Sequence, residues 1–227
     1  MHLPGDKHKA MDVFGPDWEN HFEKIRDDWL SKVADNDIVL LPGDLSWSQD
    51  ISGAAADLAS LGNLPGVKVM IRGNHDFWWS SIAKVRACLP RNMYALQNDS
   101  VLLGDVLICG SRGWVLPEEG SPTYDEDVKI HKRELIRLRM SLESGIRLGN
   151  NARAFSRLIV MTHYPPLYRY RMDTEYTALF NEFGASDVVY GHLHGEGFTS
   201  GFNGVHMGIR YHLASCDALG FRLAEIT

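Results

Sequence analysis

The chain has 227 residues, of which 44% are hydrophobic, and a formal net charge of −6. A chain of this length can bury roughly 70% of the surface that it exposes when unfolded, so we expect a single domain over residues 1–227. The acidic balance argues against a general nucleic-acid binder, whose surface is usually basic. No apolar run approaches the roughly 18 residues of a membrane span, and no apolar signal segment is visible, so we expect no membrane association.

Three cysteines, Cys88, Cys109 and Cys216, lie far apart along the chain. An odd number at wide spacing is not a disulfide framework. The pattern favours a reducing compartment, so we expect a cytoplasmic protein whose cysteines pack as small hydrophobic side chains.

Helices and short apolar strands alternate along the sequence. In the first helix, for example, Ile25, Trp29 and Val33 recur at helical spacing. In chain order, the predicted elements are a helix over 17–34, a strand over 37–41, a helix over 51–61, a strand over 67–71, a helix over 79–88, two or three strands within 93–110, a long helix over 127–148, a strand over 157–162, a helix over 174–183, a strand over 187–190, and closing strands near 208–214 and 220–225. This alternation is typical of an α/β domain.

Four of the apolar strands are followed by residue types that bind metals. They are Asp44 after the first strand, Asn74 and His75 after the second, His163 after the third, and His192 and His194 after the fourth. A single histidine at a strand end is more often structural, so the joint occurrence carries the argument. Because sites in open α/β sheets form outside the carboxyl ends of the strands, these side chains can meet in one cleft. The mixture of oxygen and nitrogen ligands suits Mn, Fe, Zn, Co or Ni.

The order Gly43-Asp44, Gly73-Asn74-His75-Asp76, His163 and Gly191-His192-Leu193-His194 resembles the calcineurin-like metallophosphoesterase superfamily. Within it, the stretches MDVFGPDWENH, IRGNHDFWWSSI, YALQND and THYPP are similar to a bacterial group of small stand-alone phosphoesterases. The resemblance covers nearly the whole chain. It implies a four-layer α/β/β/α sandwich in which two mixed sheets are flanked by helices, and it implies two divalent metal ions, with manganese expected first.

The resemblance also implies which residues hold each metal. Asp44 would bridge the two ions. Asn74, His163 and His192 would complete one metal site, and His194 would bind the other metal.

Two further motif residues, His75 and Asp76, are candidates for catalysis. By resemblance, His75 would contact the phosphate and act as general acid. Asp76 is a candidate for orienting His75, although neighbouring residues of a strand point to opposite faces. Some relatives hold this histidine with an Asp three residues after the bridging Asp, but here that position is Trp47.

Three arginines near the motifs are weaker candidates for substrate binding. Arg169 and Arg171 lie shortly after His163, and Arg112 follows an apolar run. Arginine suits phosphate oxygens, and the neighbouring tyrosines could stack on a ring. The alternative is a solvated loop with the tyrosines packed beneath it, and the sequence leaves both interpretations open.

The segment MHLPGDKH allows two registers for the family's first motif, Asp-x-His, whose two residues bind the same metal as His194 by resemblance. In one register, Asp6-Lys7-His8 is the motif. In the other, Met1-His2-Leu3 is the remnant of Asp-x-His-Leu, with the Asp and its strand absent. We expect the second, with His2 as ligand, because Pro4-Gly5 breaks the extended run before Asp6. We then expect an open strand edge, and lower stability and activity than in a chain with the strand restored.

The first functional hypothesis is a metal-dependent phosphoesterase that hydrolyses phosphomonoesters or phosphodiesters with a metal-bridging water at a dinuclear centre. An alternative is a catalytically weakened protein of the same fold that acts as a binding or regulatory module, and the missing Asp is its only support. A third interpretation, a DNA nuclease, calls for a basic groove, which the acidic balance disfavours. The natural substrate, the native metal and the oligomeric state are left open.

Overall fold

The structure is a computed structural model that describes residues 1–4, 11, 14–152 and 155–227. Its elements in chain order are η3 (Pro16–Trp18), α1 (His21–Lys32), β1 (Ile38–Leu41), α2 (Ile51–Gly62), β2 (Val67–Ile71), α3 (Ile82–Cys88), β3 (Met93–Leu96), β4 (Ser100–Leu103), β5 (Val106–Ser111), α4 (Tyr124–Ala152), β6 (Arg157–Thr162), α5 (Glu175–Glu182), β7 (Asp187–Tyr190), η4 (Gly195–Ser200), β8 (Gly204–His206) and β9 (Ile209–Leu213). None of the described helices combines the length and the apolar character needed to cross a membrane.

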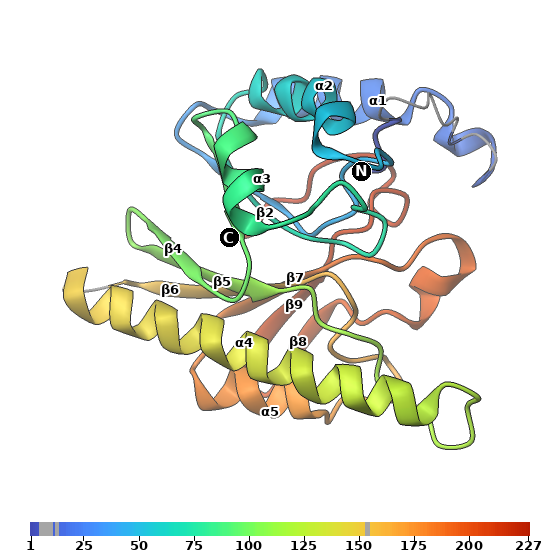
Figure 1. Cartoon of the computed structure of the whole chain (residues 1–227), viewed down its shortest axis with the longest axis vertical. Helices are drawn as coiled ribbons and strands as arrows, with labels where there is room; N and C mark the ends of the chain where they lie inside the picture. Colours follow the sequence, from blue (N-terminus) through green and yellow to red (C-terminus); the bar gives the residue numbers. More distant parts are fainter. Residues whose placement is uncertain (5–10, 12–13, 153–154) are drawn as a thin grey trace.

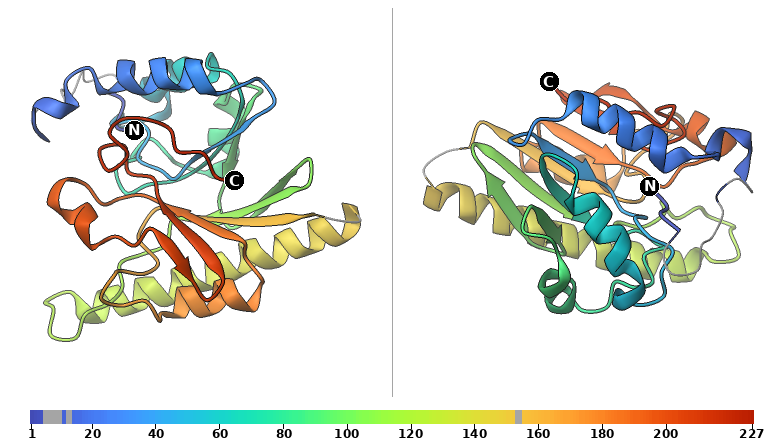
Figure 2. Two further views of the ribbon diagram at one scale, coloured as in Figure 1. Left: turned by 180° about the vertical axis from the view of Figure 1, so that it is seen from behind. Right: turned by 90° about the horizontal axis from the view of Figure 1, so that it is seen from above.

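Two sheets lie face to face in the middle of the molecule (Figure 1). The smaller sheet has the order β1-β2-β3, and its described strands are all parallel. The larger sheet has the order β4-β5-β6-β7-β9-β8 and is mixed, because β4 and β8 run antiparallel to their neighbours. Helices α1 to α3 lie outside the smaller sheet and α4 and α5 outside the larger one (Figures 1 and 2), which confirms the α/β/β/α sandwich.

Apolar side chains account for this layering. Val69 and Ile71 of β2 pack between the sheets against Ile108 and Met161 of the larger sheet. The long helix α4 buries Leu138 and Leu142 completely, at the four-residue spacing of one helix face. The inner strands β6 and β7 are buried almost throughout, as expected for parallel strands that are covered on both faces.

Most predicted elements agree with the structure, and the strands over 67–71, 157–162 and 187–190 have the predicted bounds. The first helix begins at His21 rather than at Asp17, because Asn20 before it adopts a left-handed conformation with φ 52°. The predicted strand over 220–225 is wrong. Gly220 and Phe221 have φ values of 61° and 58°, which break an extended run, and β8 pairs with β9 instead.

Strand β1 lies at the edge of the smaller sheet within the described part of the chain. A cavity of about 720 Å³ is lined by residues 38–41 of this strand and also by His2, Asp44 and His163. Its walls include Trp29 of α1 and the segment around Leu223. The edge of β1 therefore borders a large cavity that opens toward the predicted ligands.

A buried charge cluster lies at the opposite end of the larger sheet. Asp187, at the start of β7, is fully buried. It accepts hydrogen bonds from Arg157 Nε at 2.8 Å, Arg210 Nε at 2.8 Å and His212 Nε2 at 2.9 Å. The carboxylate therefore joins the first residue of β6 to two residues of β9.

Candidate metal centre

The loops that follow β1 and β2 pack backbone against backbone, which brings Asp44 and Asn74 together. A side chain at Gly43 would lie 2.6 Å from the backbone nitrogen of Gly73, and one at Gly73 would collide with Asp44. Asp44 itself has a left-handed φ of 53°, a conformation that is costly for residues with a side chain and that is concentrated at functional sites. The glycines of the two motifs are therefore required by the close approach of the loops.

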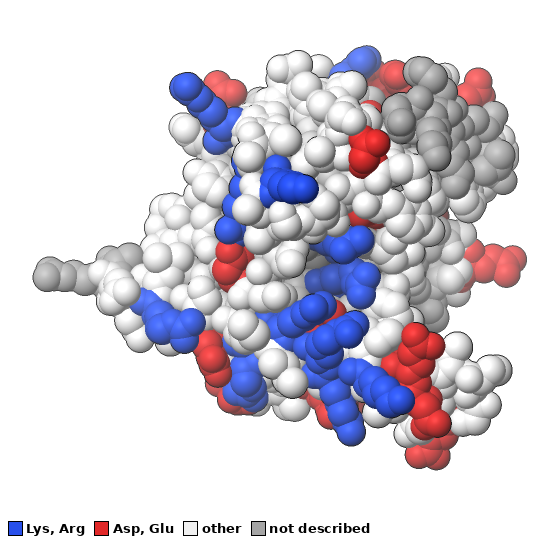
Figure 3. All heavy atoms as spheres, in the orientation of Figure 1, with Lys and Arg blue, Asp and Glu red and all other residues white. Residues whose placement is uncertain are grey.

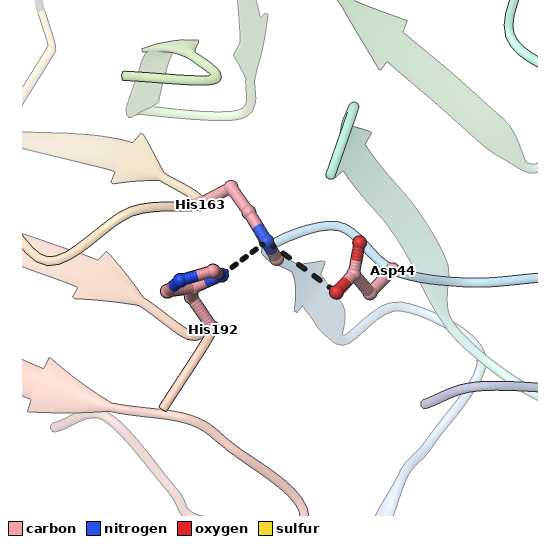
Figure 4. A group of neighbouring side chains, drawn as sticks. All are labelled: Asp44, His163 and His192. Atoms are coloured by element: carbon pink, nitrogen blue, oxygen red, sulfur yellow. Dashed lines mark hydrogen bonds and ion pairs between the residues drawn. The ribbon is translucent and has the colours of Figure 1, made fainter. Parts of the chain in front are cut away.

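Asp44, Asn74, His163 and His192 converge around one point (Figure 4, which draws three of them). His163 Nε2 lies 3.4 Å from Asp44 Oδ2, 2.6 Å from Asn74 Oδ1 and 3.2 Å from His192 Nδ1. His163 Nδ1 lies 2.8 Å from the Pro42 carbonyl oxygen. A carbonyl oxygen only accepts, so Nδ1 carries the proton and Nε2 presents a lone pair to the other three groups.

The histidines in this group are held neutral. Burial lowers the pKa of His163 to about 4, and burial followed by the neighbouring His163 lowers the pKa of His192 to about 4. Neutral imidazole is the form that binds metals. The group therefore brings together neutral imidazole nitrogens, a carboxylate oxygen and an amide oxygen, a set of ligand atoms that fits a cation at its centre.

A second group lies on the other side of Asp44. His2 Nε2 lies 3.0 Å from His194 Nε2 and 3.8 Å from Asp44 Oδ2. The backbone holds His2 in place, because its N–H donates to the Asp44 carbonyl oxygen at 2.8 Å and the next N–H, that of Leu3, donates to Leu45 at 2.8 Å. The same carboxylate oxygen of Asp44 therefore lies beside both groups. The alternative residues Asp6 and His8 fall outside the described part of the chain.

The sequence analysis missed Asp217, which holds His194. Asp217 Oδ1 lies 2.7 Å from His194 Nδ1, and its Oδ2 accepts the Gly195 N–H at 2.8 Å. This contact places a proton on Nδ1 and leaves Nε2 free to bind a metal ion. Carboxylates commonly accept the N–H of metal-ligating histidines in this way. Asp217 comes shortly after strand β9, just as the other candidates come after their strands. Its place after an apolar strand is the sequence feature that could have identified it.

His75 lies against this cluster, and its ring makes no hydrogen bond to the described residues. Its backbone N–H donates to Asp44 Oδ1 at 2.8 Å. Its ring packs on Trp47, with 4.3 Å between centroids, and lies 5.9 Å from the ring of His2. Its buried Nδ1 has no hydrogen-bond partner in the described structure. Trp47, at the position where some relatives carry an Asp, therefore contacts the ring of His75 with its own ring.

Asp76 is directed at the loop backbone rather than at the His75 ring. Its completely buried carboxylate accepts five hydrogen bonds, from the backbone N–H groups of Asp44, Leu45, Ser46 and Gly73 and from Trp78 Nε1. No ion pair joins it to His75 among the residues that the structure covers. Asp76 thus ties together the two loops that carry Asp44 and His75.

The three candidate arginines differ in position. Arg169 donates to the Gly201 carbonyl oxygen at 2.8 Å and Arg171 to that of Pro117 at 2.9 Å, so both guanidinium groups bind surface-loop backbone. Arg112 lies nearer to the ligands, since its carbonyl oxygen accepts the His163 N–H at 3.0 Å. The structure therefore brings only Arg112 of these three next to a ligand-bearing strand end.

Comparison with known proteins identifies the family. A family model described as calcineurin-like phosphoesterase matches residues 5–196. No curated protein matches the chain. Among solved structures, the crystal structure of the protein of unknown function AQ665 from Aquifex aeolicus is similar over 97% of this chain and 91% of that chain, with 12% sequence identity and a TM-score of 0.46. The matched region spans most of the sequence, includes every proposed ligand except His2, and establishes that the chain belongs to the calcineurin-like phosphoesterase family.

Proposed function

We propose that this phosphoesterase holds two divalent cations that share Asp44. The observation that carries the proposal is the convergence of lone pairs on both sides of Asp44 Oδ2, at 3.4 Å from His163 and 3.8 Å from His2. Buried acceptor atoms that face one another repel unless a proton or a cation lies between them. Burial lowers the pKa of His2 as well as that of His163, so both rings stay neutral, which is the form that binds a cation.

The first cation would be held by Asp44, Asn74, His163 and His192, and the second by Asp44, His2 and His194. Oxygen and nitrogen donors in this mixture suit Mn, Fe, Zn, Co or Ni, and we expect manganese to support activity. Bound cations of this kind neutralise charge on phosphoryl oxygens and lower the pKa of water. Asp217 would fix the orientation of the His194 ring.

We assign His75 the role of proton donor to the leaving oxygen. Its ring lies beside the cluster, and its Nδ1 has no partner within the described residues. Contact with Trp47 limits the rotation of the ring. A histidine held at such a position can donate a proton to a departing alkoxide.

The test combines metal content with turnover. The chain is stripped of metal, loaded with Mn²⁺, analysed by plasma mass spectrometry, and assayed for phosphate release from an aryl phosphate and an aryl phosphodiester. We expect about two ions per chain and turnover that a chelator abolishes. The His163→Ala variant should lose at least ~100-fold in kcat, whereas His206→Ala, at a position outside the cluster, should not.

The outcomes separate the candidate functions. Two bound ions without turnover of either substrate would favour the binding or regulatory module. Fewer than two ions would contradict the shared-carboxylate centre. Digestion of plasmid DNA under the same conditions would favour the nuclease, and the relative rates on the two aryl substrates distinguish a monoesterase from a diesterase.

A further inference from the structure

Two arginines, Arg72 and Arg112, lie at the same end of the sheets as the proposed ligands. Arg72 follows the last residue of β2 and precedes Gly73-Asn74. Arg112 follows the last residue of β5 and contacts His163 through its backbone. Both are half-buried. On the face drawn in Figure 3, Lys and Arg side chains gather over α4 and beside a hollow between the two halves of the sandwich.

Neither guanidinium group has a carboxylate partner within 4.0 Å among the described residues. Arg72 Nε is buried and lacks any hydrogen-bond partner there. The two acids that influence Arg72 are Asp76, whose carboxylate accepts five hydrogen bonds, and the buried Glu134, which pairs with Arg137 at 2.6 Å. Both acids are thus engaged elsewhere, which leaves the buried Nε–H donor free.

The strand ends that carry the two arginines lie against each other, because a side chain at Gly110 of β5 would lie 3.2 Å from Ile71 Cγ2 of β2. Burial, followed by the charge of Arg112, lowers the pKa of Arg72. Arginine stays charged at neutral pH even so, because its pKa lies above about 12. Two cations at neighbouring strand ends, one of them with an unpartnered buried donor, favour the binding of an anion there.

An aromatic wall connects this pair to the metal centre. The guanidinium of Arg112 lies over the ring of Trp114, 4.8 Å from its centroid. The Trp114 ring lies 5.1 Å from that of Tyr164, which in turn lies 4.3 Å from the ring of the proposed ligand His192. Stacking on Trp114 leaves the N–H edges of Arg112 available for paired hydrogen bonds to an oxyanion.

We propose that Arg72 and Arg112 bind a second phosphate, carried by the leaving group of the substrate. The inference rests on the proposed phosphoesterase function and adds a substrate class to it. One phosphoryl group lies at the metal centre, and a second lies beyond Tyr164 and Trp114, between the two guanidinium groups. The preferred substrates are therefore small molecules with two phosphate esters.

The test compares a series of linear diol bisphosphates with the matching hydroxyalkyl monophosphates. For the wild-type chain, the best bisphosphate should exceed its monophosphate at least ~10-fold in kcat/KM, as expected for charge-assisted hydrogen bonds to an oxyanion. Arg72→Gln and Arg112→Gln should each reduce this preference ~10-fold through a higher KM for the bisphosphate. Arg147→Gln removes a charge from an exposed site of α4 and should change neither substrate.

The melting temperature is measured for each variant, including Arg112→Lys. This measurement separates a loss of substrate binding from a loss of folding. A wild-type chain that hydrolyses both substrates without discrimination would overturn the proposal. Variants that lose activity on both substrates equally would also overturn the proposal. The arginines would then stabilise the fold or bind the phosphoryl group at the metals. Preference for a leaving group with a carboxylate in place of the second phosphate would overturn the phosphate assignment.

If the wild-type chain hydrolyses none of these compounds, the proposed function fails while the subsite remains testable. Isothermal titration with a linear alkane bisphosphonate then replaces kinetics, since this probe binds without turnover. At least ~10-fold weaker binding to Arg112→Gln than to Arg147→Gln would support the subsite. Equal affinities of the two variants would refute it.

Discussion

Substitution of Asp76 by Asn tests whether this buried carboxylate holds the site together. Asp76 Oδ1 accepts from Leu45 N, Ser46 N and Trp78 Nε1, and Oδ2 accepts from Asp44 N and Gly73 N. Burial and the nearby Asp44 raise the pKa of Asp76, whereas the five donors favour the ionised form, because a protonated oxygen would face a donor. The geometry therefore favours a charged carboxylate that only accepts.

An asparagine amide has the same shape but only one acceptor oxygen. If that oxygen takes the place of Oδ1, the amide nitrogen faces the N–H groups of Asp44 and Gly73, and both lose their acceptor. In the opposite orientation, the three donors that face Oδ1 lose their acceptor. Each unsatisfied buried donor costs about 1–3 kcal/mol, so we expect Asp76→Asn to lower the free energy of unfolding by about 2–6 kcal/mol.

The assay is urea unfolding of the metal-free chain, followed by circular dichroism, with Asp27→Asn as control. Asp27 is 70% exposed and pairs with Arg26 on the surface, so its substitution should change stability by less than about 1 kcal/mol. A loss below about 1 kcal/mol for Asp76→Asn would refute the positioning role. If turnover nevertheless disappeared, Asp76 would act in the chemistry, as the sequence analysis expected.

Three further predictions concern the cluster around Asp187, the second proposed metal site and the contact between loops. Although burial raises the pKa of Asp187, hydrogen bonds from Arg210, Arg157 and His212 lower it below the ordinary value. Its stabilisation is therefore present above about pH 4 and lost as the pH falls through the folded-state pKa, so Asp187→Asn should flatten the acid limb of a stability curve measured by urea unfolding. Asp217→Asn should weaken Mn²⁺ binding ~10–100-fold in calorimetry, and unchanged affinity would exclude its contact with His194 as an orienting bond. Gly73→Ala should lower the free energy of unfolding by at least about 1–3 kcal/mol, whereas Gly197→Ala, whose added carbon meets no atom within 4 Å, should not; equal effects would contradict the close loop packing.

The sequence predicted the ligand-bearing strand ends because that information is local. An apolar run that ends in Asp44, His163 or His192 specifies both a strand and the residue at its carboxyl end, and parallel strands bring those ends together. The order of helices and strands followed from the same periodicity. The predicted strand over 220–225 failed because left-handed residues interrupt an otherwise strand-like run.

Contacts between distant segments were beyond local patterns. Asp217 meets His194 only after β9 returns beside β7, and the ends of β2 and β5 that carry Arg72 and Arg112 come together only when the two sheets pack face to face. Asp76 was a candidate for orienting its neighbour His75, and its carboxylate turns toward the loop after β1. Such tertiary contacts depend on how elements stack, which residue spacing along one element does not encode.

The edge position of β1 has a consequence for hydrogen exchange. Backbone N–H groups on the side of β1 away from β2 have no neighbouring strand within the described residues, and the cavity lies beside them. Local opening of this strand requires fewer broken bonds than opening of an inner strand such as β6, so its amides should exchange deuterium faster. Asp44 follows β1 directly, and a cation bound there would stabilise only the closed form. Deuterium uptake in residues 38–41 would then slow as metal is added, so the edge of the sheet would report occupancy of the site.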